Sequence, residues 1–304
     1  MTHTIVLLTA SLLLALAPMP GAADTDASLE TQLQAMTAGY AGKLALFATD
    51  VRSGKTVALD ADAPVPTASI IKLAILLEAL EEVRSGLARF NEPLRLKSDN
   101  QVEGSGVLGQ FDTPLTITLK DALTMMVVVS DNTATNLAID RFGLKNIDAR
   151  ITWLGLHKTW LYKKVFKPVV EPAPADQKIF GLGKTTAREM AGVMRRFAVC
   201  DLNAPGATAK PTAADRKICG VAINMLKNQT DQIAIPRYLG NITVANKTGA
   251  LDAVRNDVGI VYAHNGPIII SAFTYQNKDT QWTPENAGQM LIAKLAKTIV
   301  DRWQ

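Results

Sequence analysis

The sequence predicts an α+β fold, in which an antiparallel five-stranded sheet is flanked by terminal helices and an all-helical subdomain is inserted between its second and third strands. Three observations predict this fold. Strand patterns occur near the two ends of the chain, helical patterns fill its middle, and 48% of the 304 residues are hydrophobic, enough for a substantial core. We expect one domain over residues 24–304, with an α/β part at about 24–62 and 213–304 and an all-α part at about 63–212.

The N-terminal part of the sheet is expected to begin with a helix and a hairpin. An amphipathic helix is predicted around Ser28–Thr37, and a nearly continuous apolar run predicts a strand over Lys43–Thr49. Ser53-Gly54 is typical of a turn, and Lys55–Leu59 has the pattern of a second strand.

The middle of the chain is expected to be helical. The segment Ser69–Val83 is too apolar for a surface helix, so we interpret it as a buried one. Helical spacing of apolar residues continues over Thr118–Val129, Asn132–Arg141, Leu144–Leu154 and Thr186–Ala198.

The C-terminal part is expected to complete the sheet and add a last helix. Strand patterns cover Asn241–Lys247, Asp257–Tyr262 and Pro267–Tyr275, and the turn His264-Asn265-Gly266 separates the last two. Thr283 is predicted to cap the terminal helix, with Pro284 as its first residue.

Composition excludes several kinds of function. Lys and Arg total 32 against 28 Asp and Glu, and no basic run reaches five residues, so no nucleic-acid partner is expected. Three histidines and two cysteines are too scattered for a conventional zinc site, so we expect neither a metal nor a cofactor. We expect a monomer that acts on a small-molecule substrate.

The first 23 residues have the pattern of a secretory signal peptide. Residues 5–17 are largely apolar, and Gly21-Ala22-Ala23 precedes the first acidic residue, Asp24. The apolar stretch is shorter than the ~20 residues that a spanning helix needs. We expect a periplasmic or secreted bacterial protein, cleaved after Ala23 and then without stable membrane insertion. Residues 1–4 contain no Lys or Arg, and an uncleaved anchor is the alternative.

Export would make a disulfide between Cys200 and Cys219 chemically permissible. Two buried or free thiols are the alternative that the sequence leaves open.

Ser69 and Lys72 are the first candidate catalytic pair. Their spacing puts both on one face of the apolar helix, near its amino end. A serine hydroxyl is a poor nucleophile until a base takes its proton, and burial lowers the pKa of a lysine toward the neutral amine that acts as such a base. On its own the pair is weak evidence, because about one S-x-x-K is expected by chance in a chain of this length. A capping serine with a snorkelling lysine is the alternative.

Two further tripeptides make the pattern specific. In Ser130-Asp131-Asn132, between two predicted helices, the aspartate is suited to cap the second helix while its neighbours face a cleft. In Lys247-Thr248-Gly249, at the end of a predicted strand, an ammonium and a hydroxyl can hold a carboxylate, and glycine lets a substrate approach. Each tripeptide has an expected chance count of roughly 0.1 or less.

With these three motifs, in this order, the chain resembles the serine penicillin-recognising enzymes, and among them the class A β-lactamases, across nearly the whole mature sequence. The resemblance implies the β-lactamase/transpeptidase-like fold. It also implies that Ser69 is the acylated nucleophile, Lys72 a base or proton relay, and Ser130 the proton shuttle to the departing lactam nitrogen.

The resemblance also implies how the substrate is held. Asn132 would bind the substrate's side-chain amide, and Lys247 and Thr248 its carboxylate, with Gly249 leaving room for it. The oxyanion hole would use the main-chain amides of Ser69 and Ala250.

A proline-rich segment holds the candidate for deacylation. In Lys167–Pro174, Glu171-Pro172 matches the Glu-Pro of the family's acidic loop, so Glu171 is our candidate base. The family pattern E-x-x-L-N then fails, because Pro174 and Ala175 replace its leucine and asparagine, and Val169 stands in place of the usual arginine. Slow deacylation, or a plain surface connection, is the alternative.

Arg255 is a candidate second cation for the substrate carboxylate, with a solvated turn charge as the alternative. Together these residues predict a serine β-lactamase that works through a Ser69 acyl-enzyme. The alternatives are a D,D-peptidase or esterase of the same superfamily that acts on peptidoglycan-like substrates, and a slowly deacylating penicillin-binding sensor.

Overall fold

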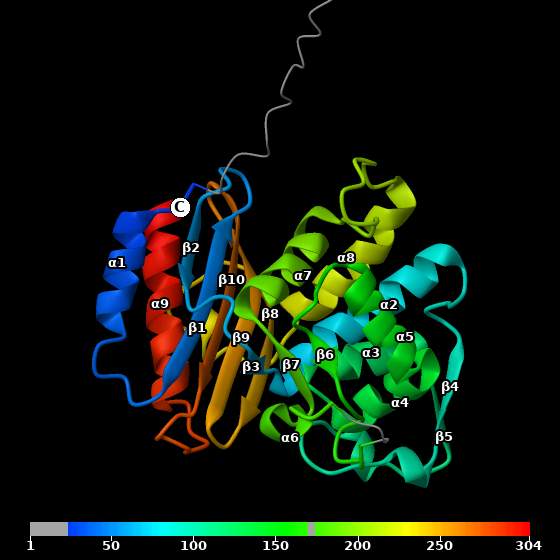
Figure 1. Ribbon diagram of the computed structural model, residues 1–304. Coiled ribbons are helices and arrows are strands. Elements are labelled where there is room, and N and C mark those ends of the chain that lie inside the picture. Colours follow the sequence, from blue (N-terminus) through cyan, green and yellow to red (C-terminus); the bar gives the residue numbers. More distant parts are fainter. Residues whose placement is uncertain (1–23, 170–173) are drawn as a thin grey trace, which may run out of the picture.

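A five-stranded antiparallel sheet forms the centre of the computed structural model, which describes residues 24–169 and 174–304. The strands lie in the order β2-β1-β10-β9-β8, as Figure 1 shows, so the predicted five-stranded sheet is confirmed. Its strands are β1 (Lys43–Asp50), β2 (Thr56–Leu59), β8 (Val244–Leu251), β9 (Val254–Ala263) and β10 (Gly266–Tyr275).

The two ends of the sequence meet inside this sheet. β1 pairs with β10 in a register that runs from Lys43 opposite Tyr275 to Asp50 opposite Ile268. β1 is therefore an interior strand packed on both faces, which explains its nearly continuous apolar run.

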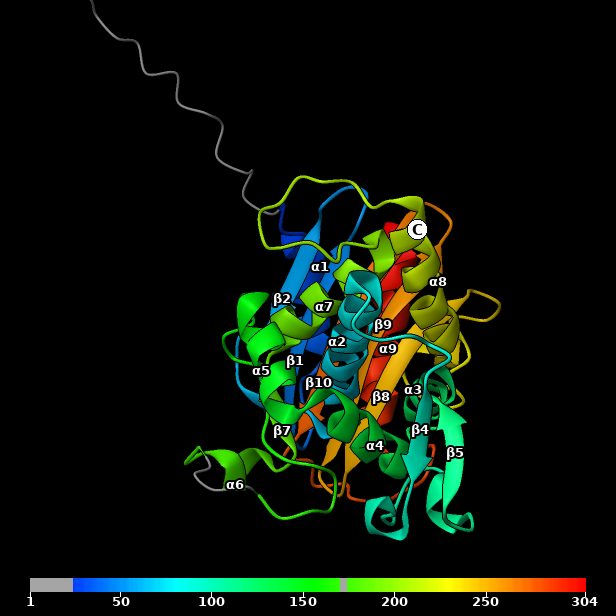
Figure 2. The ribbon, with the colours of Figure 1, turned by 90° about the vertical axis from the view of Figure 1, so that its right-hand side faces the viewer.

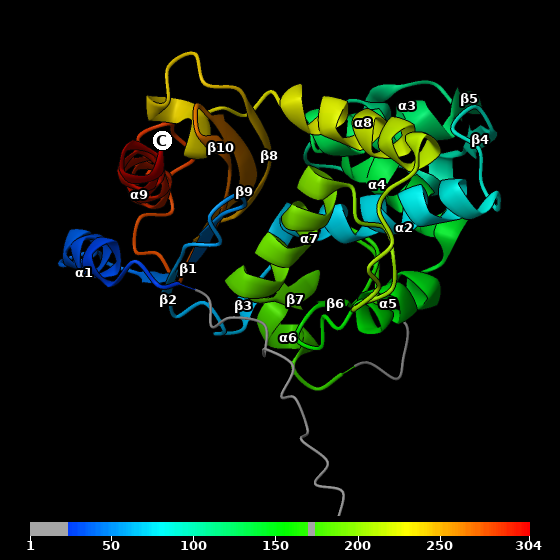
Figure 3. The same ribbon diagram turned by 90° about the horizontal axis from the view of Figure 1, so that it is seen from above.

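Two helices cover one face of the sheet. α1 (Ala27–Met36) and α9 (Ala287–Trp303) lie side by side there, and the helical part of the molecule covers the opposite face (Figures 1 and 3). Leu29 and Leu33 of α1 and Leu295 and Ile299 of α9 belong to one buried cluster with the sheet. The terminal helices thus close the α/β part of the fold.

The other face of the sheet carries the helical part. α7 contacts β1, β9 and β10, and α8 contacts β8. The α-helices of this part are α2 (Lys72–Ser85), α3 (Leu119–Val128), α4 (Asn132–Phe142), α5 (Leu144–Trp153), α6 (Gln177–Phe180), α7 (Ala187–Val199) and α8 (Ala213–Lys227). Shorter elements connect them: strands β3 (Val65–Pro66), β4 (Pro93–Leu96), β5 (Leu115–Thr118), β6 (Trp160–Leu161) and β7 (Gly183–Thr185), and 3₁₀ turns η1 (Ala68–Ile71), η2 (Ser98–Asn100), η3 (Leu108–Gln110) and η4 (Ile235–Tyr238).

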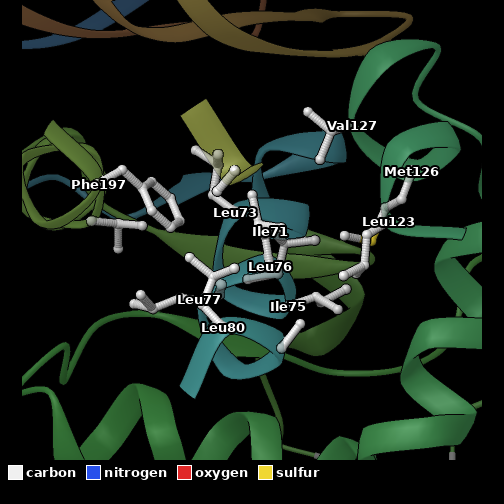
Figure 4. Close-up of a cluster of buried hydrophobic side chains, with 14 of the residues drawn as sticks. Ile71, Leu73, Ile75, Leu76, Leu77, Leu80, Leu123, Met126, Val127 and Phe197 are labelled. Atoms are coloured by element: carbon white, nitrogen blue, oxygen red, sulfur yellow. The ribbon is translucent and has the colours of Figure 1, made fainter. Parts of the chain in front are cut away.

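α2 runs through the middle of the helical part (Figure 2). Its residues from Lys72 to Leu80 are all buried, and Figure 4 shows its Leu and Ile side chains surrounded by Leu123, Met126, Val127 and Phe197. A helix that is apolar on every side needs such surroundings. The predicted buried helix is therefore confirmed, and its position carries the candidate nucleophile to the sheet.

The predicted start of the terminal helix and the predicted end of the strand at Lys247 were wrong. The terminal helix begins at Ala287 and not at Pro284, because the side chain of Asn286 caps it by accepting a hydrogen bond from the Gly288 amide at 3.0 Å. Thr283 lies in the turn before it. β8 extends to Leu251, because its pairing with β9 continues beyond Lys247.

Helix α8 was missed. Its signal was readable, because Thr212 and Asp215 form a capping box at its start, in which each side chain accepts from the other's main-chain amide.

The structure contains a disulfide bond between Cys200, which ends α7, and Cys219 in α8, with an S–S distance of 2.12 Å. The alternative of two free thiols is therefore not observed. The bond joins two helices of the helical part, which constrains the unfolded chain between them.

Within residues 24–169 and 174–304, no helix is long and apolar enough to cross a membrane. The predicted signal peptide, residues 1–23, lies outside the described residues.

Candidate active site

Ser69 lies in η1, a single 3₁₀ turn that leads directly into α2. The sequence places it at the start of the helix itself, and the structure places it one turn before. The preceding residue, Ala68, has a φ of 44°, a left-handed conformation that costs a non-glycine residue free energy and concentrates at functional sites. This turn presents a half-buried Ser69 at the contact between α2 and the sheet.

Lys72 is completely buried one turn after Ser69. Its Nζ donates to the main-chain oxygen of Ser130 at 2.6 Å, to Ser130 Oγ at 3.1 Å and to Asn132 Oδ1 at 3.0 Å. Burial lowers the pKa of Lys72 well below its ordinary value, the positive charge of Lys247 lowers it further, and Asp131 opposes both. The amine is therefore shifted toward the neutral form that can accept a proton.

Ser130 stands between two lysines. Its Oγ accepts from Lys72 Nζ and from Lys247 Nζ, both at 3.1 Å. A hydroxyl has two acceptor lone pairs and one proton, so two amine donors occupy its acceptor sites and leave its own proton for another partner. Ser130 also has a left-handed φ of 56°, a second strained position at this site.

Asp131 holds this strained segment in place. Its Oδ1 caps α4 by accepting from the Ala134 amide at 2.7 Å, as the sequence predicts. Its Oδ2 accepts from the amides of Val107 and Leu108 at 2.6 and 2.8 Å, two contacts that no local sequence pattern predicts. A Cβ at Gly106 would lie 2.2 Å from this carboxylate, so only glycine fits there.

Asn132 bridges Lys72 and the loop before η3. Its Oδ1 accepts from Lys72, and its Nδ2 donates to the Glu103 main-chain oxygen at 3.1 Å. A Cβ at Gly104 would lie 2.7 Å from that Nδ2, so glycine permits the close approach.

Lys247 reaches the site from β8. Its buried Nζ donates to Ser130 Oγ and to the Thr248 main-chain oxygen at 2.8 Å. Burial lowers the pKa of Lys247 to about 8, although Asp231 and Asp257 act in the opposite direction. At pH 7 this lysine therefore remains mostly charged beside the two hydroxyl-bearing residues Ser130 and Thr248.

Gly249 lets β8 lie against the nucleophile turn. A Cβ at this position would come within 2.9 Å of the Thr67 main-chain oxygen and 3.0 Å of the Ser69 main-chain nitrogen. The glycine of the third motif is thus required for close packing between strand and turn.

A cavity of about 460 Å³ opens beside Ser69. Asn132 and Ala250 also line it, so the structure brings these three predicted site residues to one space. The other lining residues include Gly104, Ser105, Lys163, Val165, Phe166, Gly181, Leu182, Leu251, Asp252 and Trp282.

Arg255 is buried below the β8–β9 turn, with 2% of its surface exposed. Its Nη1 donates to the main-chain oxygens of Leu251 and Val254, and its Nη2 to that of Gln281 at 2.7 Å. The guanidinium lies 4.5 Å from the ring of Trp282. Arg255 is therefore not a solvated turn charge, which was the alternative expectation. It is also not among the described residues that line the cavity beside Ser69.

Glu171 lies outside the described residues. The chain on either side of it is anchored. Buried Asn136 bonds both main-chain groups of Val165, at 3.0 and 2.8 Å, and Asp176 bonds Lys184 and the Tyr162 hydroxyl. These contacts hold the segment ends without the arginine that the family pattern has at position 169.

Asp257 is a buried acid outside the three sequence motifs. It stands opposite Thr248 in the β8–β9 register and accepts from the Ile235 amide and from Asn246 Nδ2, both at 2.9 Å. Burial raises its pKa to about 7, with Asp231 raising it further and Lys247 lowering it. Asn246 Oδ1 has no hydrogen-bond partner among the described residues.

Asp257→Asn is expected to increase the free energy of unfolding above pH 7. Because the folded pKa of about 7 exceeds the ordinary 3.8, the folded state binds the proton more tightly and wild-type stability falls as pH rises from about 4 to 7. Asparagine is neutral and keeps a donor and an acceptor, so the variant avoids this loss of stability. We expect its free energy of unfolding to exceed that of the wild type by on the order of 2 kcal/mol at high pH. Urea unfolding at acidic and alkaline pH measures the effect, with exposed Asp112→Asn as control. An equal pH dependence in wild type and Asp257→Asn would contradict this assignment.

Within the part of the chain that the structure describes, no group of three or more His, Cys, Asp or Glu is arranged to hold a metal ion. The polar side chains that meet around Ser130 are hydroxyls, amines and an amide, which are suited to nucleophilic acyl transfer.

Comparison with known proteins agrees with this chemistry. The model of the β-lactamase enzyme family matches residues 28–303. A β-lactamase of Amycolatopsis lactamdurans is 26% identical over 262 residues, which cover 85% of this chain and 81% of that protein. The β-lactamase regulatory protein BlaB of Streptomyces cacaoi is 23% identical over 288 residues, covering 83% of this chain and 90% of that one.

A solved structure shares the fold. The β-lactamase from Sphaerobacter thermophilus DSM 20745 superposes with a TM-score of 0.76 at 24% identity, over 91% of this chain and 96% of that one. The family match covers nearly the whole described chain, and the resemblance that the three motifs predict is confirmed. The chain belongs to the β-lactamase enzyme family.

Proposed function

We propose that this protein is a serine β-lactamase that opens the β-lactam ring through an acyl-enzyme on Ser69. The observation that carries the proposal is the pair of buried amines on Ser130 Oγ, one of which, Lys72, follows Ser69 by a single helical turn. This arrangement supplies a nucleophile, an amine whose pKa burial lowers so that it can exchange a proton, and a hydroxyl whose proton is free to be transferred.

Acylation uses these groups in turn. Lys72 takes the proton of Ser69 Oγ as that oxygen bonds to the lactam carbonyl carbon, and the main-chain amides of Ser69 and Ala250 hold the resulting oxyanion. Collapse of the tetrahedral intermediate breaks the ring C–N bond. Ser130 gives its proton to the departing nitrogen and regains one from Lys72, whose Nζ lies 3.1 Å from Ser130 Oγ.

The remaining motif residues orient the substrate. Lys247 carries the charge that pairs with the substrate carboxylate, Thr248 adds a hydroxyl, and Asn132 offers its amide to the substrate's acyl amide. Gly249 lets the strand lie against the turn that carries Ser69. These roles agree with the positions of Asn132 beside the cavity and of Lys247 beside Ser130.

Deacylation requires a water molecule activated by a base, and we assign this role to Glu171 on the strength of the Glu-Pro pattern alone.

We also propose that residues 1–23 are removed on export and that the protein works as a monomer in the periplasm or outside the cell. Its activity would contribute to antibiotic resistance.

One experiment tests this function. The purified protein is mixed with a chromogenic cephalosporin, and colour release is followed together with the intact mass of the protein. We expect sustained release over many equivalents of substrate and a mass that returns to that of the free protein. A single equivalent of colour with a persistent adduct would instead indicate a penicillin-binding protein that does not turn over.

A non-hydrolytic sensor is the second candidate. It is favoured by the relative whose name is β-lactamase regulatory protein and by the departure of Pro174 and Ala175 from the family's deacylation pattern. A D,D-peptidase using the same four side chains would give a similar adduct, and would in addition release D-alanine from a peptidoglycan-like peptide.

The pKa of Lys247 leads to a pH prediction. Because burial lowers it to about 8, the lysine loses its charge, and with it the attraction for a substrate carboxylate, as pH rises through this value. We expect kcat/KM for a carboxylate-bearing β-lactam to fall above about pH 8 through a rise in KM. A neutral ester of the same β-lactam serves as control and is expected to lack this decline. An identical decline for acid and ester would contradict the role of Lys247.

A further inference from the structure

We propose that Trp282 forms an aromatic wall of the substrate cavity and makes the enzyme select β-lactams with an aromatic acyl group. This inference rests on the proposed function and names the substrate class of the same site. It assigns a role to a residue outside the three motifs, in the loop between β10 and α9.

Trp282 is unusually exposed for its size. Its exposed fraction is 66%, and it lines the cavity that also contains Ser69. Phe166, 59% exposed, lines the same cavity from the helical part of the chain. Large exposed aromatic side chains in a concave site mark a surface that binds an apolar group.

The indole is held in place before any ligand arrives. Its Nε1 donates to Asp252 Oδ1 at 3.3 Å, and the guanidinium of Arg255 lies 4.5 Å from its ring. Arg255 is itself fixed by main-chain oxygens on both sides, those of Val254 at 2.8 Å and Gln281 at 2.7 Å. An aromatic group ordered in this way loses little conformational entropy when a ligand stacks on it.

The cavity lies on the acyl side of the substrate. Its lining includes Asn132 and Ala250, which are assigned to the acyl amide and the oxyanion hole, whereas Lys247 and Thr248, assigned to the carboxylate, are not among its described lining residues. A group that extends from the acyl amide into this space meets Trp282. Because Asp252 already occupies the indole N–H, a neutral aromatic ring stacking on the indole is the best fit.

The test compares two substrates that differ only in the acyl group: benzylpenicillin, which carries a phenylacetyl group, and 6-aminopenicillanic acid, which has none. In Trp282→Ala we expect kcat/KM to fall about three- to tenfold for benzylpenicillin and to stay nearly unchanged for 6-aminopenicillanic acid. Trp282→Phe is expected to keep most of the preference. Trp153→Ala is the matched control, because Trp153 is also exposed and lies 4.8 Å from an arginine, Arg150, but on α5 and outside the described lining of this cavity.

The hydrogen bond from Trp282 can be tested separately. Asp252→Ala is expected to reduce the ratio of the two kcat/KM values, and Asp252→Asn, which retains an acceptor oxygen, is expected to restore it. An equal change for both substrates, or none, in Trp282→Ala would overturn the inference while the wild type still hydrolysed both. Failure of the wild type to react with either compound would instead overturn the proposed function.

Discussion

Ser69→Ala is expected to abolish β-lactam turnover, with a loss in kcat of at least about 10⁴-fold, because it removes the only atom that forms the covalent intermediate. The variant should fold, since the substitution deletes one half-buried hydroxyl and leaves η1 and the core around α2 intact. The measurement is the steady-state rate with a chromogenic cephalosporin, together with intact mass after exposure to excess substrate. Neither colour release nor an adduct is expected.

Ser105→Ala is the matched control for this experiment. Ser105 is a serine that lines the same cavity, and the proposal gives it no role in catalysis. It should retain most of the wild-type rate. Turnover in Ser69→Ala close to that of Ser105→Ala would mean that another group is the nucleophile.

Lys72→Met is expected to lower kcat/KM by about 10²- to 10⁴-fold, the range that a positioned general base contributes. Methionine matches the length of the lysine and tolerates the apolar surroundings of α2, so the fold should persist. Loss of the amine also removes the group whose deprotonation activates Ser69. Because burial lowers the pKa of Lys72, the wild-type rate should rise with pH on the acidic side, and this rise should disappear in the variant.

The pH dependence separates a base from a merely structural lysine. Lys120→Met, at an exposed position of α3, should leave both the rate and its acidic limb unchanged. A Lys72→Met enzyme that was slow but kept the wild-type acidic limb would show that another group accepts the Ser69 proton.

Local patterns in the sequence predicted the sheet and the central helix. The apolar runs and turn signals around β1, β2, β9 and β10 are local, and the apolar run after Ser69 is long enough to predict burial of α2. Asp131 could be placed as a helix cap for the same reason, since its partner Ala134 is only three residues away. The three motifs then identified residues that the structure brings around Ser130.

Contacts between distant parts of the chain could not be predicted in this way. The guanidinium of Arg255 bonds Gln281, 26 residues further along, and the Asp131 carboxylate bonds Val107, 24 residues before it. The sequence around Arg255 does not reveal whether its guanidinium pairs with a substrate carboxylate or packs against the ring of Trp282. The raised pKa of Asp257 likewise depends on its burial between β8 and η4.

Peptide mapping of the trapped acyl-enzyme shows directly whether Ser69 carries the substrate. The protein is mixed with a β-lactam, quenched with acid within milliseconds to seconds, digested, and examined by mass spectrometry over a time course. We expect one adduct with the full mass of the substrate, on the peptide that contains Ser69, which decays as hydrolysed product accumulates. An adduct on another residue, or product formation in which Ser69 is never modified, would rule out Ser69 as the nucleophile.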